Sequence, residues 1–329
     1  MTIGYRQLGA SGLKLSQLSL GSWVTFGNQV DCDMAYDLMT YAYDQGINFF
    51  DNAEVYAQGE SERLMGAVLK KTGWGRDTFC VSSKVFWGGD KPTQRGLSRK
   101  HIHDACHGAL NRLGVDYLDL YFCHRPDPDT PIRETVMAMN DLIVQGKVLY
   151  WGTSEWRPNH LIEAHKLAQK YGWHAPIMEQ PEYNLMNRSN MEVQLKPVLA
   201  TYGMGTTTWS PLCSGFLSGK YQHGIPKGAR FGLPDYTWLA DRYYSDQGRL
   251  RIQQVDQLKA IIEPLAEFTM AQIAIAWCLL NPQVSTVILG ASNRAQLQEN
   301  VASVGAIAAL TPDIQAALNR VFPCNPHSC

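Results

Sequence analysis

The chain has 329 residues, of which 45% are hydrophobic and 18% are charged, and this balance supplies a large core and excludes a disordered protein. Its 29 Lys and Arg residues against 30 Asp and Glu residues give a net charge of −1, which excludes the global basic field of a protein whose main partner is nucleic acid. The longest apolar stretch, residues 273–280, is far below the ~20 residues of a membrane span, and the N-terminus has no apolar core of signal-peptide length, so we expect a cytoplasmic protein without direct membrane insertion.

Short β-like runs alternate with helical patterns along almost the whole chain. The opening segment, residues 5–15, has Gly9 and Gly12 in its middle and predicts a hairpin that closes the bottom of the fold. The strand candidates after it are residues 17–21, 47–51, 79–84, 117–124, 148–154, 177–180, 205–210 and 285–290. Helices are expected between them, for example over residues 98–113, 131–145, 157–171 and 191–202.

The helical segments have recognisable ends. Ser98 can cap the first turn of its helix, and Gly114 stops that helix. Pro131 stands at a plausible first helical position, and the same segment ends at Gly146. Strands separated by such helices favour parallel β/α units over a sandwich.

Eight strands is the number that closes a (β/α)8 TIM barrel, an α/β fold, and an open doubly wound sheet is the alternative. No Pro- or Ser-rich linker interrupts the pattern, so we expect one domain over residues 1–329. One segment after the seventh strand, residues 213–245, contains five Gly and two Pro and is too long for a plain connection. We expect it to cover a cofactor or substrate at the barrel mouth.

Five expected strands end in polar residues, namely Asp51, Lys84, His124, Ser154 and Gln180. Polar groups are expensive to bury without partners, and a barrel places its catalytic groups at the carboxyl ends of its strands. Any one of the five could be a structural accident. Five polar residues at equivalent strand ends together favour a functional site.

Tyr56 follows Asp51 by five residues and adds a proton donor to this set. The ordinary pKa of tyrosine is near 10, too high for an efficient acid at neutral pH. A nearby ammonium lowers it, so we expect Lys84 to tune Tyr56, Asp51 to pair with Lys84, and His124 to orient a substrate oxygen. Together these four residues suit proton donation to a carbonyl.

Several longer stretches of the sequence resemble those of a known family. The tetrad Asp51, Tyr56, Lys84 and His124 resembles that of the aldo-keto reductases. Within that family the chain resembles the branch of the voltage-gated potassium channel beta subunits, and the plant and microbial members in particular. The stretches that carry this resemblance are FWGG at 86–89, RGLSRKHI at 95–102, RPDPDTP at 125–131, YWGTS at 150–154, SGKY at 218–221, AIAWC at 274–278 and GASN at 290–293. The resemblance covers about residues 8–300. Animal channel beta subunits have Asn where His124 stands, so His124 restores the ordinary reductase tetrad.

The resemblance implies a binding site for NADP(H) that runs along the mouth of the barrel. The implied contacts of the nicotinamide half are Ser22, Trp23, Gln29, Asp51, Ser154 and Gln180. Those of the ribose and pyrophosphate are Trp209, Ser210, Pro211, Leu212, Cys213, Ser214, Lys220 and Arg230. Those of the adenosine end are Gly290, Ala291, Ser292, Gln296, Glu299 and Asn300.

The residues themselves agree with a phosphate at the adenosine end. A strand that ends in Gly290, followed by a helix that opens at Asn293, offers backbone amides to an anion. Arg230 and Ser292 favour a 2′-phosphate, hence NADP(H) over NAD(H), and Arg294 either assists or is solvated. The resemblance also implies a substrate pocket, formed by Trp23, Tyr56, Trp87 and His124.

Three functions remain open. The first is NADPH-dependent reduction of aldehydes and ketones, with a small carbonyl substrate and Tyr56 as the acid. The second is a redox-sensing, cofactor-binding subunit that docks on a potassium channel alpha subunit, and the resemblance also implies a homo-oligomer, expected to be a tetramer. The third, weaker one is a Schiff-base lyase that uses Lys84.

Other motifs are weaker. The glycines at 203–205 resemble the start of a dinucleotide fingerprint, but Thr208 occupies the third glycine position, and residues 215–220 lack one residue for a P-loop. His101, His103 and His107 are expected to be solvated helix residues, and no metal site is predicted. The eight cysteines contain no CxxC pair and predict reduced, mostly buried thiols.

Overall fold

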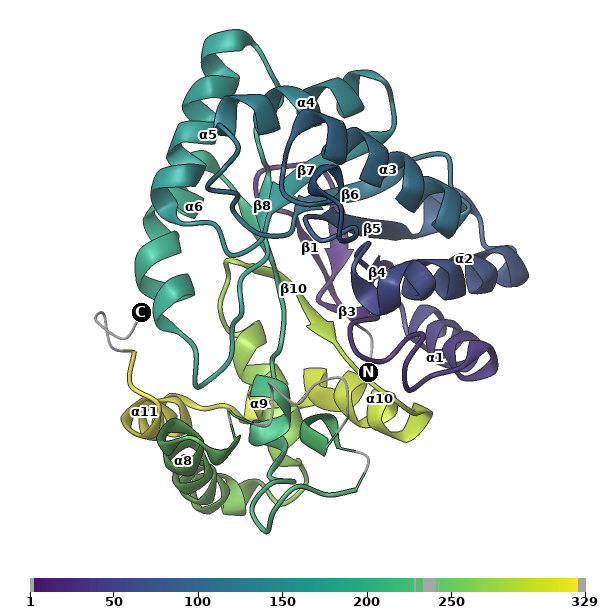
Figure 1. Cartoon of the computed structure of the whole chain (residues 1–329). Coiled ribbons are helices and arrows are strands. Elements are labelled where there is room, and N and C mark those ends of the chain that lie inside the picture. The colour runs from purple at the N-terminus through teal and green to yellow at the C-terminus, as the bar shows by residue number, and fades with distance from the viewer. Residues whose placement is uncertain (1–2, 228, 233–240, 242, 325–329) are drawn as a thin grey trace.

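The computed structural model describes residues 3–227, 229–232, 241 and 243–324. Eight parallel strands close into a barrel in the order β10-β3-β4-β5-β6-β7-β8-β9, and helices surround it (Figure 1). The expected (β/α)8 TIM barrel is therefore confirmed. The barrel strands are β3 (Leu18–Gly21), β4 (Phe49–Asp51), β5 (Cys80–Val85), β6 (Leu118–Cys123), β7 (Val148–Thr153), β8 (Met178–Glu179), β9 (Gly205–Thr208) and β10 (Val284–Leu289).

The expected hairpin is also present. Strands β1 (Tyr5–Gln7) and β2 (Lys14–Ser16) pair antiparallel. Leu8 and Leu15, from the hairpin, join an inner cluster with Phe49, Leu120 and Phe122 of the barrel strands. The hairpin thus fills one end of the barrel with apolar side chains and leaves the opposite end for polar groups.

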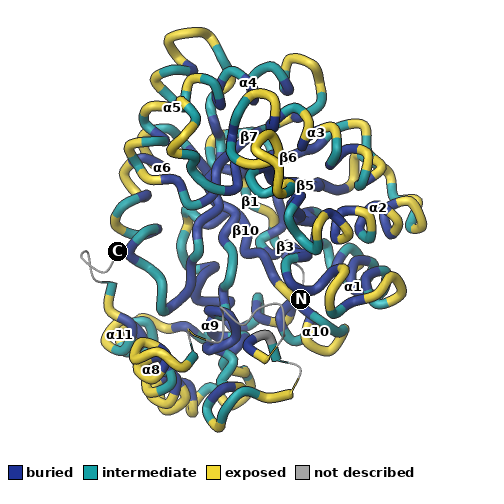
Figure 2. Tube along the Cα trace, viewed as in Figure 1, coloured by how far each residue is buried: buried dark blue, intermediate teal, exposed yellow. Residues whose placement is uncertain are grey.

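The helices pack on the outside of the strands, and the larger apolar core lies between the two layers. Figure 2 shows the buried strands enclosed by helices whose outer surfaces are exposed. Some helices approach each other through glycine: a Cβ at Gly66 would lie only 2.5 Å from the backbone oxygen of Arg112. The helices are α1 (Cys32–Asp44), α2 (Glu60–Thr72), α3 (Arg99–Leu113), α4 (Ile132–Val144), α5 (Pro158–Tyr171), α6 (Lys196–Tyr202), α8 (Asp246–Ile262), α9 (Met270–Leu279), α10 (Arg294–Val301) and α11 (Pro312–Val321).

Most predicted ends of these elements are accurate within two residues. Ser98 caps α3 by accepting from the backbone N–H of His101, and Gly114 ends that helix at a positive φ of 66°. Pro131 is the residue before α4 rather than its first residue. The helix expected over residues 191–202 begins with a π-helical turn, η4 (Asn190–Leu195), ahead of α6.

The long segment after β9 is only partly described. Its start forms the 3-10 turn η5 (Cys213–Ser218), and η6 (Arg230–Gly232) follows. An aromatic cluster of Phe216, Tyr221, Phe231 and Tyr243 connects the described parts. Residues 228, 233–240 and 242 of the expected covering loop lie outside the described residues.

No single helix in the described ranges has both the length and the apolar composition to cross a bilayer. Two helix pairs, Asp246–Leu265 with Met270–Leu279 and Arg294–Ala309 with Pro312–Val321, meet that test only when joined across bends of 90° and 112°.

Candidate active site

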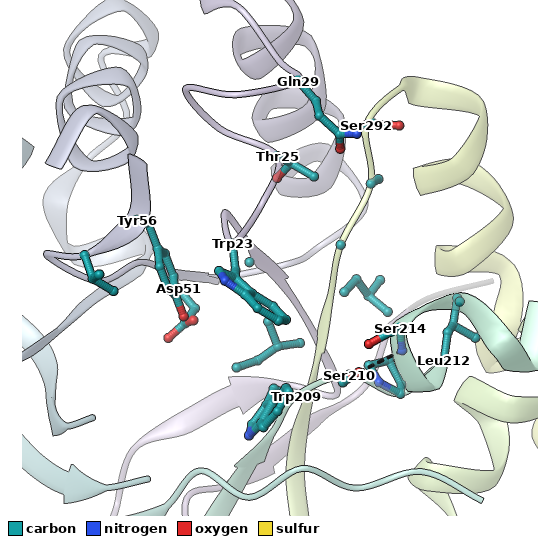
Figure 3. Close-up of a pocket in the computed structure, with 18 of the residues that line it drawn as sticks. Trp23, Thr25, Gln29, Asp51, Tyr56, Trp209, Ser210, Leu212, Ser214 and Ser292 are labelled. Carbon is teal, nitrogen blue, oxygen red and sulfur yellow. Dashed lines mark hydrogen bonds between the residues drawn. The ribbon is translucent and has the colours of Figure 1, made fainter. Parts of the chain in front are cut away.

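A cleft of about 1390 Å³ opens at the carboxyl ends of the barrel strands. Figure 3 shows Tyr56 and Asp51 together in one part of it, well apart from Gln29 and Ser292. The cleft brings together most of the residues predicted from the sequence. These are Trp23, Gln29, Asp51, Tyr56, Trp87, His124, Ser154, Gln180, Trp209, Ser210, Pro211, Leu212, Ser214, Lys220, Gly290, Ala291, Ser292, Gln296, Glu299 and Asn300.

A buried ion pair lies beneath the floor of the cleft. Lys84 Nζ donates to Asp51 Oδ2 at 2.6 Å and to the backbone oxygen of Asn52 at 2.8 Å. The side chains of Lys84 and Asp51 are 0% and 4% exposed. Burial alone would lower the pKa of Lys84, but the charges and hydrogen bonds of Asp51 and Tyr56 together outweigh it and hold that pKa above its ordinary value. Lys84 is therefore a fixed cation at neutral pH.

Tyr56 stands above this pair on the turn that follows β4. Its hydroxyl lies 3.2 Å from Lys84 Nζ. Ala57 and Gln58, directly after it, both have positive φ values, of 47° and 54°, an uncommon backbone conformation for residues other than glycine that recurs at functional sites. This sharp turn directs the chain into α2 immediately after Tyr56.

The structure corrects one expectation about Tyr56. Burial raises the pKa of its hydroxyl, and this effect exceeds the opposite effect of the Lys84 charge, so the net pKa lies above the ordinary value. The ammonium is visible in the sequence pattern, but the desolvation of the phenol arises only in the folded chain. Tyr56 is therefore protonated at neutral pH, as a proton donor must be, and Lys84 limits the rise.

His124 directly follows β6 and is 6% exposed. Its ring lies 5.8 Å from that of Tyr56 and 5.1 Å from that of Trp87. Burial, together with the charges of Lys84 and Arg125, places its pKa well below the ordinary value, so the ring is neutral. Its Nδ1 is buried and has no hydrogen-bond partner among the described residues, and an unpaired acceptor is less costly than an unpaired N–H. This favours a proton on Nε2.

Two polar residues extend the site beyond the tetrad. Ser154 Oγ donates to the backbone oxygen of Gln180 at 2.8 Å. Gln180 Nε2 donates to Thr207 Oγ1 at 3.1 Å and to Asp51 Oδ1 at 3.3 Å. Serine and glutamine are thereby held in fixed orientations beside the ion pair.

The segment after β9 curls into a cradle on the wall of the cleft. Ser210, Cys213 and Ser214 all have positive φ values, and the backbone N–H of Ser214 donates to Ser210 Oγ at 3.1 Å. A Cβ at Gly215 would lie 2.9 Å from Lys220 Nζ. The cradle thus places hydroxyl groups and an ammonium close to the same turn.

The far end of the cleft is formed by the start of α10. Asn293 caps this helix by accepting from the backbone N–H of Gln296. Gln296 Oε1 in turn accepts from the backbone N–H of Ser292 at 3.0 Å, and Asn300 Nδ2 donates to the oxygen of Gly290 at 3.3 Å. The result is a polar cup of hydroxyl, amide and backbone groups.

Three predicted residues do not line the cleft within the described part of the chain. Ser22 is buried, with its hydroxyl donating to the backbone oxygen of Asp51 at 3.0 Å. Lys84 lies beneath the floor, and Cys213 is buried, with its sulfur accepting from Asn187 at 3.6 Å. Arg230 belongs to η6, and its side chain lies outside the described residues.

Arg294, whose role the sequence left open, is half-exposed and forms an ion pair with Asp37 of α1. It is engaged on the outer surface rather than in the cleft.

The sequence analysis missed a buried pair behind the wall of the cleft. His101 was expected to be solvated, and this was wrong, because it is 3% exposed. Its Nδ1 lies 2.8 Å from the oxygen of Gly96, and its Nε2 lies 3.5 Å from Glu54 Oε2. Glu54 also accepts from the backbone N–H of Phe86 at 2.7 Å. The pair thus holds the segment that carries Trp87.

Arg125 is the second residue that the sequence analysis missed. It lines the cleft directly after His124, and its position after a polar strand end was the available signal. Its Nη1 donates to the oxygen of His124 at 2.5 Å and to Ser154 Oγ at 3.2 Å. Arg125 therefore places a cation beside His124 and Ser154.

Comparisons with known proteins agree with this geometry. The chain is 48% identical over 323 residues to a protein of Oryza sativa subsp. japonica named "probable voltage-gated potassium channel subunit beta", covering 98% of this chain and 97% of that one. It is 47% identical, with the same coverage, to a protein of that name from Arabidopsis thaliana. The sequence model of the aldo/keto reductase family matches residues 17–321. The chain belongs to the aldo/keto reductase family.

Proposed function

We propose that this protein reduces aldehydes and ketones to alcohols with NADPH. Membership of the family supports an oxidoreductase function, and aldo/keto reductases generally use NAD(P)H. The observation that carries the proposal is the position of the half-buried Tyr56, whose hydroxyl lies 3.2 Å from a buried ammonium beneath the floor of the cleft. A bound nicotinamide would supply a hydride to the carbonyl carbon.

Tyr56 would deliver the proton to the carbonyl oxygen as negative charge develops there. Its phenol is protonated at neutral pH because burial raises the pKa. Lys84 stabilises the phenolate that proton transfer leaves, through a charge-assisted hydrogen bond. Asp51 holds the ammonium in place from the other side, at 2.6 Å.

His124 would orient the substrate. A neutral imidazole with its proton on Nε2 donates a hydrogen bond to the carbonyl oxygen without competing for the proton of Tyr56. The low pKa of His124 keeps the ring in that state. The edge-on contacts of its ring with Tyr56 and Trp87, 67–77° between planes, limit rotation and therefore hold the donor toward the site.

The chemistry of the lining residues fits a dinucleotide phosphate. Ser154 and Gln180 would bind the carboxamide, the cradle with Lys220 would bind the pyrophosphate, and the cup around Ser292 and Gln296 would bind the adenosine 2′-phosphate. Ammonium, hydroxyl and backbone N–H groups are the donors that phosphates require. The hydroxyl of Ser292, together with Arg230, favours NADP(H) over NAD(H).

The test measures loss of NADPH absorbance with a panel of aldehydes that includes 4-nitrobenzaldehyde. Tyr56→Phe should lose most turnover, by roughly 100- to 10,000-fold for a missing general acid, while NADPH binding in a titration stays close to wild type. Turnover at the wild-type rate would remove Tyr56 from the mechanism. Absence of binding of either nicotinamide cofactor would refute the proposal.

A second candidate function rests on the names of the two plant relatives. In this function the chain is a cofactor-binding subunit that docks on a potassium channel alpha subunit and reports redox state. Co-purification with the cytoplasmic domain of such a channel would support it, and no association at micromolar concentrations would count against it. The two functions are compatible in one protein. Cytoplasmic location, a single domain over residues 1–329 and a homotetramer belong to the same proposal.

A further inference from the structure

Six side chains form a continuous chain of contacts at the substrate end of the cleft. Tyr56 contacts His124, His124 contacts Trp87, and the Arg125 guanidinium lies 5.6 Å from the ring centre of Trp87 and 6.0 Å from that of Trp209. Trp209 in turn lies edge-on to Trp23 at 5.9 Å. All six line the cleft. Arg125 is the one residue of this set with a permanent charge.

The guanidinium of Arg125 is only partly used by the protein. Both of its hydrogen bonds among the described residues come from Nη1, to the oxygen of His124 and to Ser154 Oγ. Across the described ranges, Nε and Nη2 donate to no protein atom, and no carboxylate forms an ion pair with Arg125. Nε and Nη2 form one edge of the guanidinium, and such a pair of parallel N–H groups matches the two oxygens of a carboxylate.

Three acidic residues of this region have other partners. Asp51 is paired with Lys84, and Glu54 is bound to Phe86 N–H and faces His101. Glu155, next in the chain to Ser154, accepts from the Trp209 indole at 3.0 Å. A half-buried cation between two indoles is poorly hydrated, so an anionic ligand gains more there than at an open surface.

We propose that Arg125 is a specificity-determining residue that selects carbonyl substrates bearing a carboxylate. The aromatic walls formed by Trp87 and Trp209 hold the body of the substrate, and Arg125 binds its carboxylate while the carbonyl faces Tyr56 and His124. This inference rests on the proposed reductase function and names its substrate class. Neutral aldehydes remain substrates but do not form the charge-assisted hydrogen bonds with Arg125.

The experiment compares two substrates that differ by one negative charge and one methyl group, 4-carboxybenzaldehyde and its neutral ester methyl 4-formylbenzoate. In the wild type, kcat/KM should favour the carboxylate. Arg125→Gln should lower the carboxylate-to-ester ratio of kcat/KM by about 10- to 100-fold, the range for one hydrogen-bonded charge, chiefly through KM. Arg125→Lys should restore only part of the ratio, because an ammonium cannot form the bidentate pair.

Arg95 provides the matched control. It lines the same cleft and has the same charge, but it is exposed at the rim. If Arg95→Gln lowers the ratio as much as Arg125→Gln does, the preference reflects the general field of the cleft mouth and the proposal is overturned. A ratio that stays at the wild-type value in Arg125→Gln also overturns it. The proposal likewise fails if Arg125→Gln weakens NADPH binding more than it lowers the ratio, since Arg125 then serves the cofactor.

A binding measurement separates this inference from the reductase proposal. Calorimetric titration of the NADPH-saturated protein should show benzoate binding more tightly than benzamide, with the difference lost in Arg125→Gln. If no carbonyl is turned over, the reductase function fails, yet this titration still decides whether Arg125 binds carboxylates. If the ester is reduced but benzoate and benzamide bind equally, the reductase function stands and the carboxylate site is refuted.

Discussion

The Asp51–Lys84 ion pair supports a quantitative prediction, because both side chains are almost completely buried. At a separation of 2.6 Å, Coulomb attraction is on the order of 6 kcal/mol at an effective dielectric constant of about 20. Desolvation of both ions consumes much of that attraction. Removing one partner leaves the other charge buried, which typically costs about 3–5 kcal/mol of folding stability.

We expect each single substitution to fall near the lower end of that range. In Lys84→Met, the Asp51 carboxylate keeps the hydroxyl of Ser82 at 2.8 Å and the amide of Gln180 at 3.3 Å. In Asp51→Asn, the ammonium keeps the oxygen of Asn52 and the hydroxyl of Tyr56. The double variant should lose far less than the additive value of about 6 kcal/mol, because it leaves no unpaired charge.

Urea unfolding of the four proteins measures this coupling, with the exposed pair Glu60–Arg63, 62% and 55% exposed, as a control expected to couple by less than about 1 kcal/mol. Additive losses at Asp51 and Lys84, within about 0.5 kcal/mol, would refute the reasoning. In the same variants, turnover should fall with Lys84→Met, because Lys84 is the charge that most opposes the rise in the pKa of Tyr56.

Two further predictions concern pH. Burial raises the pKa of Glu179 from 4.5 to about 8, so the folded protein retains this proton where the unfolded chain loses it. The stabilisation is complete below pH 4.5 and is lost as the pH rises through about 8, by on the order of a few kcal/mol. Glu179→Gln should flatten the dependence of unfolding free energy on pH over this interval, and an unchanged slope would contradict the assignment. For His101, burial lowers the pKa, but the hydrogen bond and charge of Glu54 contribute to a larger opposite effect. The net pKa therefore lies above the ordinary value of 6.5. Its stabilisation is therefore complete below pH 6.5 and lost above it, and the difference in unfolding free energy between wild type and His101→Gln should shrink as the pH rises. KM for aromatic aldehydes should increase in that variant, since the pair holds the segment of Trp87; equal effects on kcat and KM would indicate a merely structural loss.

Much of the fold was predictable from local sequence. The alternation of apolar runs with capped helices is set by chemistry within a few residues, as Ser98 and Gly114 at the two ends of α3 illustrate. The barrel followed because eight such units can close on themselves. The grouping of Asp51, Lys84 and His124 was predictable for the same reason: in parallel strands that share one direction, polar residues near the carboxyl ends meet at one mouth.

Other features depended on contacts between distant segments. Burial of His101 against Glu54, 47 positions earlier in the chain, has no signature in the helical pattern, since α3 turns that side of itself toward the loop after β5. The pKa of Tyr56 depends on how completely the fold removes water from its hydroxyl, and that desolvation outweighed the ammonium that the sequence pointed to. Arg125 acquired its significance only when Trp87 and Trp209, from different strand ends, came to flank it. The sequence thus determined which groups reach the barrel mouth, because strand direction is a local property. The tertiary structure decided their charges and partners, because desolvation and long-range packing exist only in the folded chain.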